Sequence, residues 1–201
     1  MQANRSEPLL NPVDRPGGLF LRLAFYMSRR LYGRVIAPLR YFYARKPGLL
    51  RISLRMNRAA EKLSLEPTLC SLITIYAAFQ AGCRFCQDFG MALAVKAGLG
   101  DLKFQALAAD DLSVFTEREQ AALMFTRAIM RSQDGHADAP PALRDQFTDT
   151  EIVEIVYLIA MERYYNTISM GLGLNSDDLA PRLHAETRTT GRPGESAVKI
   201  A

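Results

Sequence analysis

The stretch Gln80-Ala-Gly-Cys83-Arg-Phe-Cys86-Gln-Asp-Phe-Gly90 holds the two most closely spaced cysteines of the chain. An apolar helical segment, residues 69–79, precedes it, and a second helical segment, residues 91–96, follows it. The pair is therefore expected at the start of a helix, where unpaired backbone N–H groups and the helix dipole favour an anion. Because a thiolate is such an anion, this position should lower the pKa of at least one of the two thiols.

The spacing of Cys83 and Cys86 suits thiol–disulfide chemistry. Residues three apart on a helix face the same side, so the two sulfurs can form a disulfide with little backbone movement. One thiolate attacks a substrate, and its neighbour then resolves the adduct as the disulfide. With a hydroperoxide as substrate the intermediate is a sulfenic acid.

Two other interpretations of the pair remain open at this point. Buried cysteines are often inert core residues, although the polar neighbours Arg84, Gln87 and Asp88 argue against full burial. A zinc site is less favoured, because the chain has no second C-x-x-C. Zinc would then need Cys70, which we expect to be a small core residue, together with one of the two histidines, His136 and His184.

Apolar residues recur at helical spacing almost throughout the chain, which predicts an all-α, single-domain helical bundle. Proline at the first helical position predicts helices that begin at Pro47 and Pro67. The capping boxes Thr116–Glu119 and Thr148–Glu151 predict two more helices. The expected segments are a basic aromatic helix over 19–45 broken near Pro38, a helix over 47–63 that buries Leu50, Ile52 and Leu54, a cysteine helix stopped by Gly98 and Gly100, a helix from 116 to about 130, and an apolar helix over 149–170 that should be central.

Three regions are expected along the chain. Residues 1–16 are polar and proline-containing and are interpreted as a flexible arm. Residues 17–183 should form the helical domain, and residues 184–201, which contain glycine and proline but few apolar residues, should be a disordered tail. The 201 residues are 49% hydrophobic, which is enough for one core.

Composition favours a cytoplasmic protein without membrane spans. No apolar run approaches the roughly 18 residues of a span, the first residues are polar, and three cysteines are too few for a disulfide scaffold. Residues 15–66 hold 12 Lys/Arg against 2 Asp/Glu. We interpret the basic aromatic segment 19–46 as a site of helix packing and subunit contacts, with contact to an anionic membrane surface as a less favoured alternative and no motif for nucleic acid.

The order of these pieces resembles the carboxymuconolactone decarboxylase and alkylhydroperoxidase D-like superfamily. The resemblance rests on the helix begun by Pro67, the segment Gly82-Cys83-Arg-Phe-Cys86, and the later segments 115–119, 161–166 and 172–174. It implies an all-helical bundle that forms a homo-oligomer. In alkylhydroperoxidase-type members the second cysteine attacks the peroxide and the first resolves it, which implies these roles for Cys86 and Cys83.

The usual proton relay of those members is missing from this sequence. Its glutamate, twelve residues before the first cysteine, is replaced by Ser71, and its histidine, four residues after the second, is replaced by Gly90. Phe85 stands where a further histidine sometimes occurs. Asp88 is the nearest ionisable substitute and becomes a candidate catalytic residue. On the apolar helix, Glu162 and Tyr164 or Tyr165 could also face the cysteines, although an ion pair of Glu162 with Arg163 or Arg127 is an equal alternative.

The sequence therefore predicts a thiol-dependent reductase of hydroperoxides or disulfides that uses Cys86, Cys83 and Asp88. An external dithiol would supply the electrons, and no cofactor or metal is expected. The alternative is a non-catalytic protein on the same scaffold that senses redox state or binds a partner.

Overall fold

The computed structural model describes residues 7–96, 101–132 and 136–181, and these residues form helices and connecting loops without a strand. The predicted all-α class is therefore confirmed. In chain order the elements are α1 (Leu19–Tyr32), a π-helical turn η1 (Leu39–Tyr43), α2 (Pro47–Ala60), α3 (Pro67–Ala81), α4 (Arg84–Lys96), α5 (Asp101–Ala108), α6 (Glu117–Arg131), α7 (Leu143–Gln146) and α8 (Asp149–Gly171).

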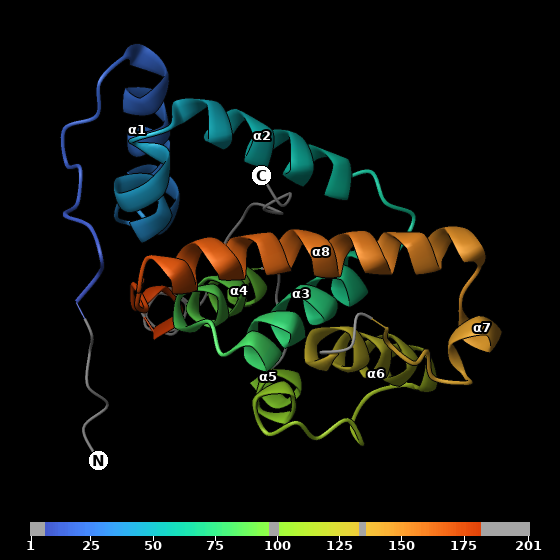
Figure 1. Cartoon of the computed structure of the whole chain (residues 1–201). Helices are drawn as coiled ribbons and strands as arrows, with labels where there is room; N and C mark the ends of the chain where they lie inside the picture. Colours follow the sequence, from blue (N-terminus) through green and yellow to red (C-terminus); the bar gives the residue numbers. More distant parts are fainter. Residues whose placement is uncertain (1–6, 97–100, 133–135, 182–201) are drawn as a thin grey trace.

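Helix α3 lies at the centre of the packing, with α8, α6 and α4 against it. Its residues Leu72, Ile73 and Tyr76 are 0% exposed. Figure 1 shows α8 running across the middle of the molecule, with α1 and α2 on one side and α3, α4 and α6 on the other. The helix that carries the predicted site, α4, is thereby held between α3 and α8.

The prediction that α8 would be central is only partly right. Two of its tyrosines hold it against α2. Tyr157 donates a hydrogen bond to the Met56 carbonyl at 2.8 Å, and Tyr165 donates one to Asn57 Oδ1 at 2.9 Å. Val153 and Val156, however, are 67% and 42% exposed. The apolar sequence of the first half of α8 therefore also covers part of an outer face.

Local sequence signals set most helix starts as predicted. Pro47 and Pro67 begin α2 and α3, and both capping boxes are formed. Two expectations were wrong. The first basic helix ends at Tyr32, because Gly33 takes a left-handed conformation there, and Pro38 instead leads into η1. Ile52 is 49% exposed, since Leu50 and Ser53 take the inner face of α2.

Residues 7–16 of the predicted arm carry no helix but are hydrogen-bonded to the helical domain. Leu9 N–H donates to the Leu172 carbonyl and Val13 N–H donates to the Arg40 carbonyl, each at 3.0 Å. The Asp14 carboxylate forms an ion pair with the Arg40 guanidinium. The predicted stop at Gly98 and Gly100 and the predicted tail 184–201 lie outside the described residues, and the boundaries of the three regions stay predictions.

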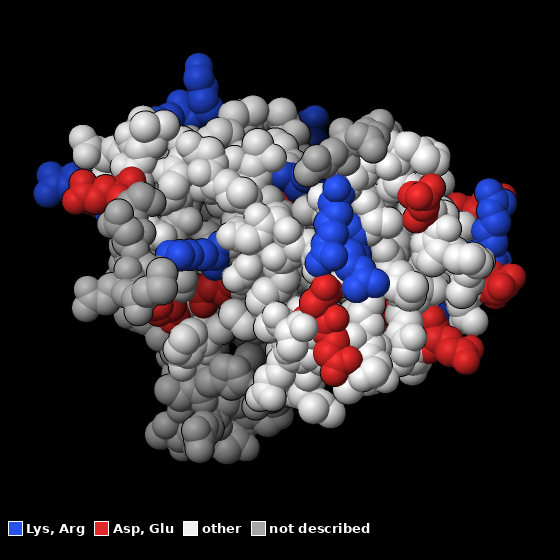
Figure 2. Space-filling model, turned by 60° about the horizontal axis from the view of Figure 1, so that its bottom comes forward, with Lys and Arg blue, Asp and Glu red and all other residues white. Residues whose placement is uncertain are grey.

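Charged and apolar side chains are distributed differently on different sides of the surface. Figure 2 shows the face toward the bottom of Figure 1, where basic and acidic side chains adjoin among wide uncharged areas. By contrast, α1 exposes Leu19, Leu23, Tyr26 and Met27 beside Arg22, Arg29 and Arg30, and its sequence contains no acidic residue. No helix within the described ranges has the length and apolar character needed to cross a bilayer. The homo-oligomer, the membrane contact and the cytoplasmic location stay predictions.

The capping boxes provide a first test of the fold. In Thr148→Ala the side-chain oxygen that accepts the Glu151 N–H is lost, so the free energy of unfolding should fall by about 1 kcal/mol. Denaturant unfolding measures this change. Thr167→Ala is the matched control, because the Thr167 hydroxyl only donates to a carbonyl inside α8. Equal stability of both variants would contradict a role for the cap.

Candidate active site

The turn between α3 and α4 places the cysteine pair. Gly82 ends α3 in a left-handed conformation, at φ 70°, and the Cys83 N–H returns to the Ala78 carbonyl at 3.2 Å. Cys83 then stands directly before α4, and its carbonyl accepts the Gln87 N–H at 2.9 Å. The expected position at the start of a helix is confirmed, so the helix dipole favours negative charge on these sulfurs.

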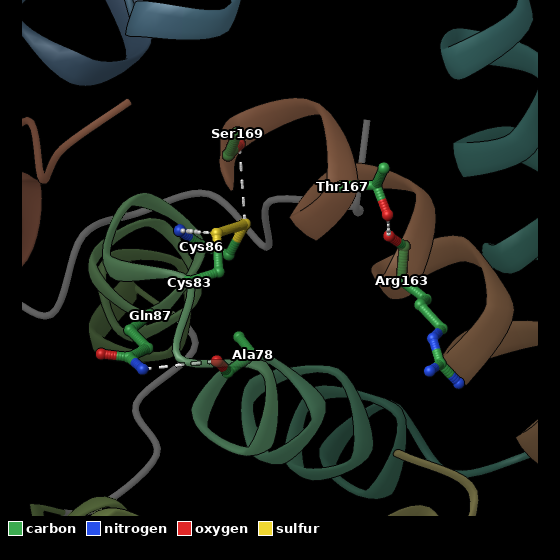
Figure 3. Close-up of a disulfide and its surroundings, with 7 residues drawn as sticks. All are labelled: Ala78, Cys83, Cys86, Gln87, Arg163, Thr167 and Ser169. Atoms are coloured by element: carbon green, nitrogen blue, oxygen red, sulfur yellow. Dashed lines mark hydrogen bonds between the residues drawn. A yellow bond between two sulfur atoms is a disulfide. The ribbon is translucent and has the colours of Figure 1, made fainter. Parts of the chain in front are cut away.

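Cys83 and Cys86 form a disulfide, with their Cα atoms 5.3 Å apart. Figure 3 shows both sulfurs facing α8, while Gln87 turns the other way and donates a hydrogen bond to the Ala78 carbonyl at 3.3 Å. The Cys86 N–H points at Cys83 Sγ, 3.3 Å away, and Ser169 Oγ of α8 lies 3.7 Å from Cys86 Sγ. A disulfide sulfur carries no proton, so the Ser169 hydroxyl is the only possible donor in that last contact.

The polar neighbours of the pair do not keep it at the surface, contrary to expectation. Cys83 is 1% exposed and Cys86 is 7% exposed, because the first turn of α4 packs both of them against Ala78 of α3 and Leu174 beyond α8. Of the polar neighbours, only Arg84 is exposed, and Asp88 is itself buried.

Cys86 nevertheless borders a partly open cavity. It lines a cavity of about 470 Å³ bounded by α1, η1 and α2 on one side and by α3, α4 and α8 on the other. The wall includes the stacked rings of Phe85 and Phe89, 5.8 Å apart, and Tyr32, whose ring is 5.3 Å from Phe89. Cys83 is not among the lining residues. The cavity therefore presents one reactive sulfur to an apolar occupant, with the second sulfur behind it.

Residues 47–128, which contain the pair and the helices around it, match the carboxymuconolactone decarboxylase family. This match covers about two fifths of the chain and agrees with the family expected from the sequence. The resemblance expected from the sequence, which includes the alkylhydroperoxidase D-like proteins, is thereby confirmed. A comparison with curated proteins gives no match.

Solved structures of other proteins share the fold. A protein of unknown function from Agrobacterium tumefaciens, described as a candidate antioxidant defence protein AhpD, is 24% identical, with a TM-score of 0.61 over 67% of this chain and 94% of its own. The debrominase Bmp8, in a variant complexed with 2,3,4-tribromopyrrole, is 19% identical, with a TM-score of 0.73 over 90% of this chain and 97% of its own. The apo form of Bmp8 gives the same identity and TM-score.

The positions of the missing superfamily relay line the cavity without replacing it. Ser71 donates its hydroxyl to the Pro67 carbonyl at 2.9 Å, so its proton is used within α3. Gly90 lies so close to α3 that an added Cβ would be 2.9 Å from Ile75 Cγ1. A side chain at residue 90 would therefore require α3 and α4 to separate or Ile75 to shift.

Asp88, the predicted substitute for the relay, has a different function in the structure. Its carboxylate accepts three backbone N–H groups, those of Asp177, Leu179 and Ala180, at 3.0, 3.0 and 2.9 Å. It is 4% exposed and does not line the cavity. Asp88 thus anchors the segment that follows α8, and its geometry gives no support to the predicted catalytic role.

The sequence left open whether Glu162 faces the cysteines or forms an ion pair with an arginine. It lines the cavity with Cys86, and neither of its expected partners reaches it, because Arg127 pairs with Asp110 and Arg163 donates to the Ile129 carbonyl. Burial raises the pKa of this carboxyl well above its ordinary value. Of the two tyrosines predicted beside it, Tyr165 lines the cavity and Tyr164 does not.

The remaining sulfur and imidazole candidates lie apart from the pair. Cys70 is buried in the core, where burial raises its thiol pKa to about 11. His136 is exposed beside Asp138, and His184 lies outside the described residues. Within the described ranges, no group of three or more His, Cys, Asp or Glu side chains is arranged to hold a metal ion.

The three hydrogen bonds of Asp88 predict a structural phenotype. Asp88→Asn keeps the size of the side chain but replaces one accepting oxygen by an NH₂ group, so at least one buried backbone N–H loses its partner. We expect a loss of about 2 kcal/mol in the free energy of unfolding, measured by denaturant titration. Asp145→Asn, at an exposed aspartate, is the control and should be neutral. A stable Asp88→Asn protein that had lost redox turnover would instead support the catalytic role.

Proposed function

We propose that this protein is a thiol-dependent reductase of apolar organic hydroperoxides. The observation that carries the proposal is the placement of the Cys86 sulfur in the wall of a largely aliphatic and aromatic cavity, with Cys83 bonded to it from behind. The match of residues 47–128 to the carboxymuconolactone decarboxylase family and the AhpD description of the Agrobacterium protein support the same chemistry.

The reaction proceeds in two steps on the reduced protein. The Cys86 thiolate attacks the terminal oxygen of the hydroperoxide, the O–O bond breaks, and the alkoxide leaves and takes up a proton to become the alcohol. Cys83 then attacks the resulting sulfenic sulfur, water leaves, and the Cys83–Cys86 disulfide forms. An external dithiol restores both thiols by exchange and is itself oxidised to a disulfide.

The cavity predicts which peroxides are preferred. Each buried CH₂-sized group contributes about 0.8 kcal/mol, and about 1.4 kcal/mol is a tenfold change. A hydroperoxide that buries several carbons against the cavity wall should therefore exceed H₂O₂ in kcat/KM by more than about tenfold. The apolar wall is what separates this proposal from a general peroxide scavenger.

A second candidate reaction uses the same sulfurs. The thiol pair could remove bromine from an aromatic ring: the ring carbon gains a proton, bromine leaves as bromide, and the two thiols become the disulfide. The apolar wall with its stacked Phe85 and Phe89 rings favours a flat aromatic occupant, and the similar fold of the debrominase Bmp8 makes 2,3,4-tribromopyrrole the natural probe.

Consumption of cumene hydroperoxide, H₂O₂ and 2,3,4-tribromopyrrole with dithiothreitol as donor tests both candidates. We expect wild type to prefer cumene hydroperoxide and Cys86→Ser to abolish turnover. Without dithiol, Cys83→Ser should accumulate a sulfenic acid that dimedone traps, whereas wild type should form the disulfide. Cys70→Ala is the matched control and should retain turnover, because Cys70 lies away from the cavity.

Other outcomes would assign the protein differently. Turnover of the brominated ring alone would support the second candidate and exclude the first. A wild-type protein that forms the disulfide but turns over none of the three substrates would favour the redox-sensing alternative. Wild-type rates in Cys86→Ser would contradict any role for this sulfur.

A further inference from the structure

The alkoxide that leaves during peroxide reduction needs a proton, and the residues of the usual relay cannot supply it. The Ser71 hydroxyl donates its hydrogen bond to the Pro67 carbonyl, and residue 90 is a glycine without a side chain that could donate a proton. General acid–base assistance is worth about 100- to 10,000-fold in rate. An efficient enzyme on this scaffold therefore requires another proton donor with access to the cavity.

Among the described residues that line the cavity, Glu162 is the only charged one, and we propose that it supplies this proton. The other titratable lining groups are Cys86 of α4, Tyr32 of α1, Tyr43 of η1 and Tyr165 of α8, while α2 and α3 contribute none. Burial raises the pKa of Tyr32 and of Tyr43 to about 12 and raises that of Tyr165 further. These tyrosines hold their protons too tightly to compete with the carboxyl near neutral pH.

Glu162, Asn166 and Ser169 place polar side chains along the face of α8 that leads toward the Cys86 sulfur. Glu162 and Asn166 are four residues apart, and Asn166 and Ser169 are three apart, so neighbouring members share one face of the helix. Ser169 Oγ is in turn 3.7 Å from Cys86 Sγ. The rest of this face packs among apolar residues, so three polar side chains along it are unusual and indicate a polar function.

Asn166 is the most deeply buried polar side chain between Glu162 and Ser169 on this face of α8. Its side chain is 2% exposed, and neither Nδ2 nor Oδ1 has a hydrogen-bond partner within the described part of the chain. Buried amides are almost always hydrogen-bonded. Asn166 does not line the cavity, so the polar face of α8 reaches the cavity through Glu162 and Ser169.

The distances on α8 define the role of the carboxyl. Seven residues of helix separate Glu162 from Ser169, which is about 10 Å along the axis. The proton therefore passes from Glu162 through a bound water or the Ser169 hydroxyl to the alkoxide, and the thiol proton of the next cycle returns by the same route. Because burial raises the pKa of this carboxyl, the group holds its proton to a higher pH than an ordinary carboxyl does and can donate it to the alkoxide.

This inference rests on the proposed function, and leaving-group dependence tests it separately. Glu162→Gln should lower kcat with cumene hydroperoxide by about 100-fold, because an alkoxide is a poor leaving group without an acid. With peracetic acid, whose leaving group is a carboxylate, the same variant should lose far less. Glu162→Asp should restore part of the rate with cumene hydroperoxide, and the pH profile of kcat should lose its Glu162-dependent limb only in Glu162→Gln.

Several results would overturn the assignment. An equal loss with both oxidants would indicate a structural defect, no loss would exclude a role for Glu162, and a change confined to KM would indicate substrate binding instead. In each of these cases an active wild type would leave the proposed function standing. Wild type that reduces neither oxidant would refute the proposed function itself.

A measurement without peroxide keeps the inference testable in that last case. A carboxyl whose pKa is higher in the folded than in the unfolded protein stabilises the fold at low pH, and this stabilisation is lost as the pH rises from the unfolded value, about 4.3, through the folded value. Wild type should thus lose stability relative to Glu162→Gln as the pH rises. A constant difference between the two would show an ordinary carboxyl and would overturn its role as the acid.

Discussion

The left-handed turn at Gly82 is the constraint on which the site depends. It reverses the chain between α3, the most buried helix, and α4, so that Cys83 precedes the first turn of α4 and Cys86 lies within it. The α4 dipole then acts on both sulfurs, and packing against α8 brings Ser169 to Cys86. A bulkier or differently folded turn would change all three relations together.

The cavity then decides what this pair can react with. Helices α1 and α2 cover the disulfide side of α3, α4 and α8, and the space left between them is apolar apart from a few hydroxyls, an amide and Glu162. Electrostatic interactions are stronger in such surroundings than in water. One carboxyl can therefore influence the protonation of a nearby thiol or alkoxide far more than it could at an exposed site.

The sequence was sufficient for features that depend on near neighbours in the chain. Pro67, the two capping boxes and the glycine before Cys83 act locally, and each helix start followed as predicted. The sequence was insufficient for features that depend on contacts between segments far apart in the chain. The role of Asp88 depends on backbone groups about ninety residues away. The two arginines expected beside Glu162 instead contact other groups, since Arg127 pairs with Asp110 and Arg163 donates to the Ile129 carbonyl. The cavity arises only once α1 and α2 are packed, and exposure of Ile52 follows from the same packing.

We infer that Cys86, and not Cys83 or Cys70, is the sulfur that an apolar molecule reaches. Limited reaction of the reduced protein with N-phenylmaleimide, followed by peptide mass spectrometry, tests this inference. We expect Cys86 to be modified first, because it alone of the three cysteines lines the cavity. Modification of Cys83 or Cys70 before Cys86, or no modification until the protein unfolds, would contradict it.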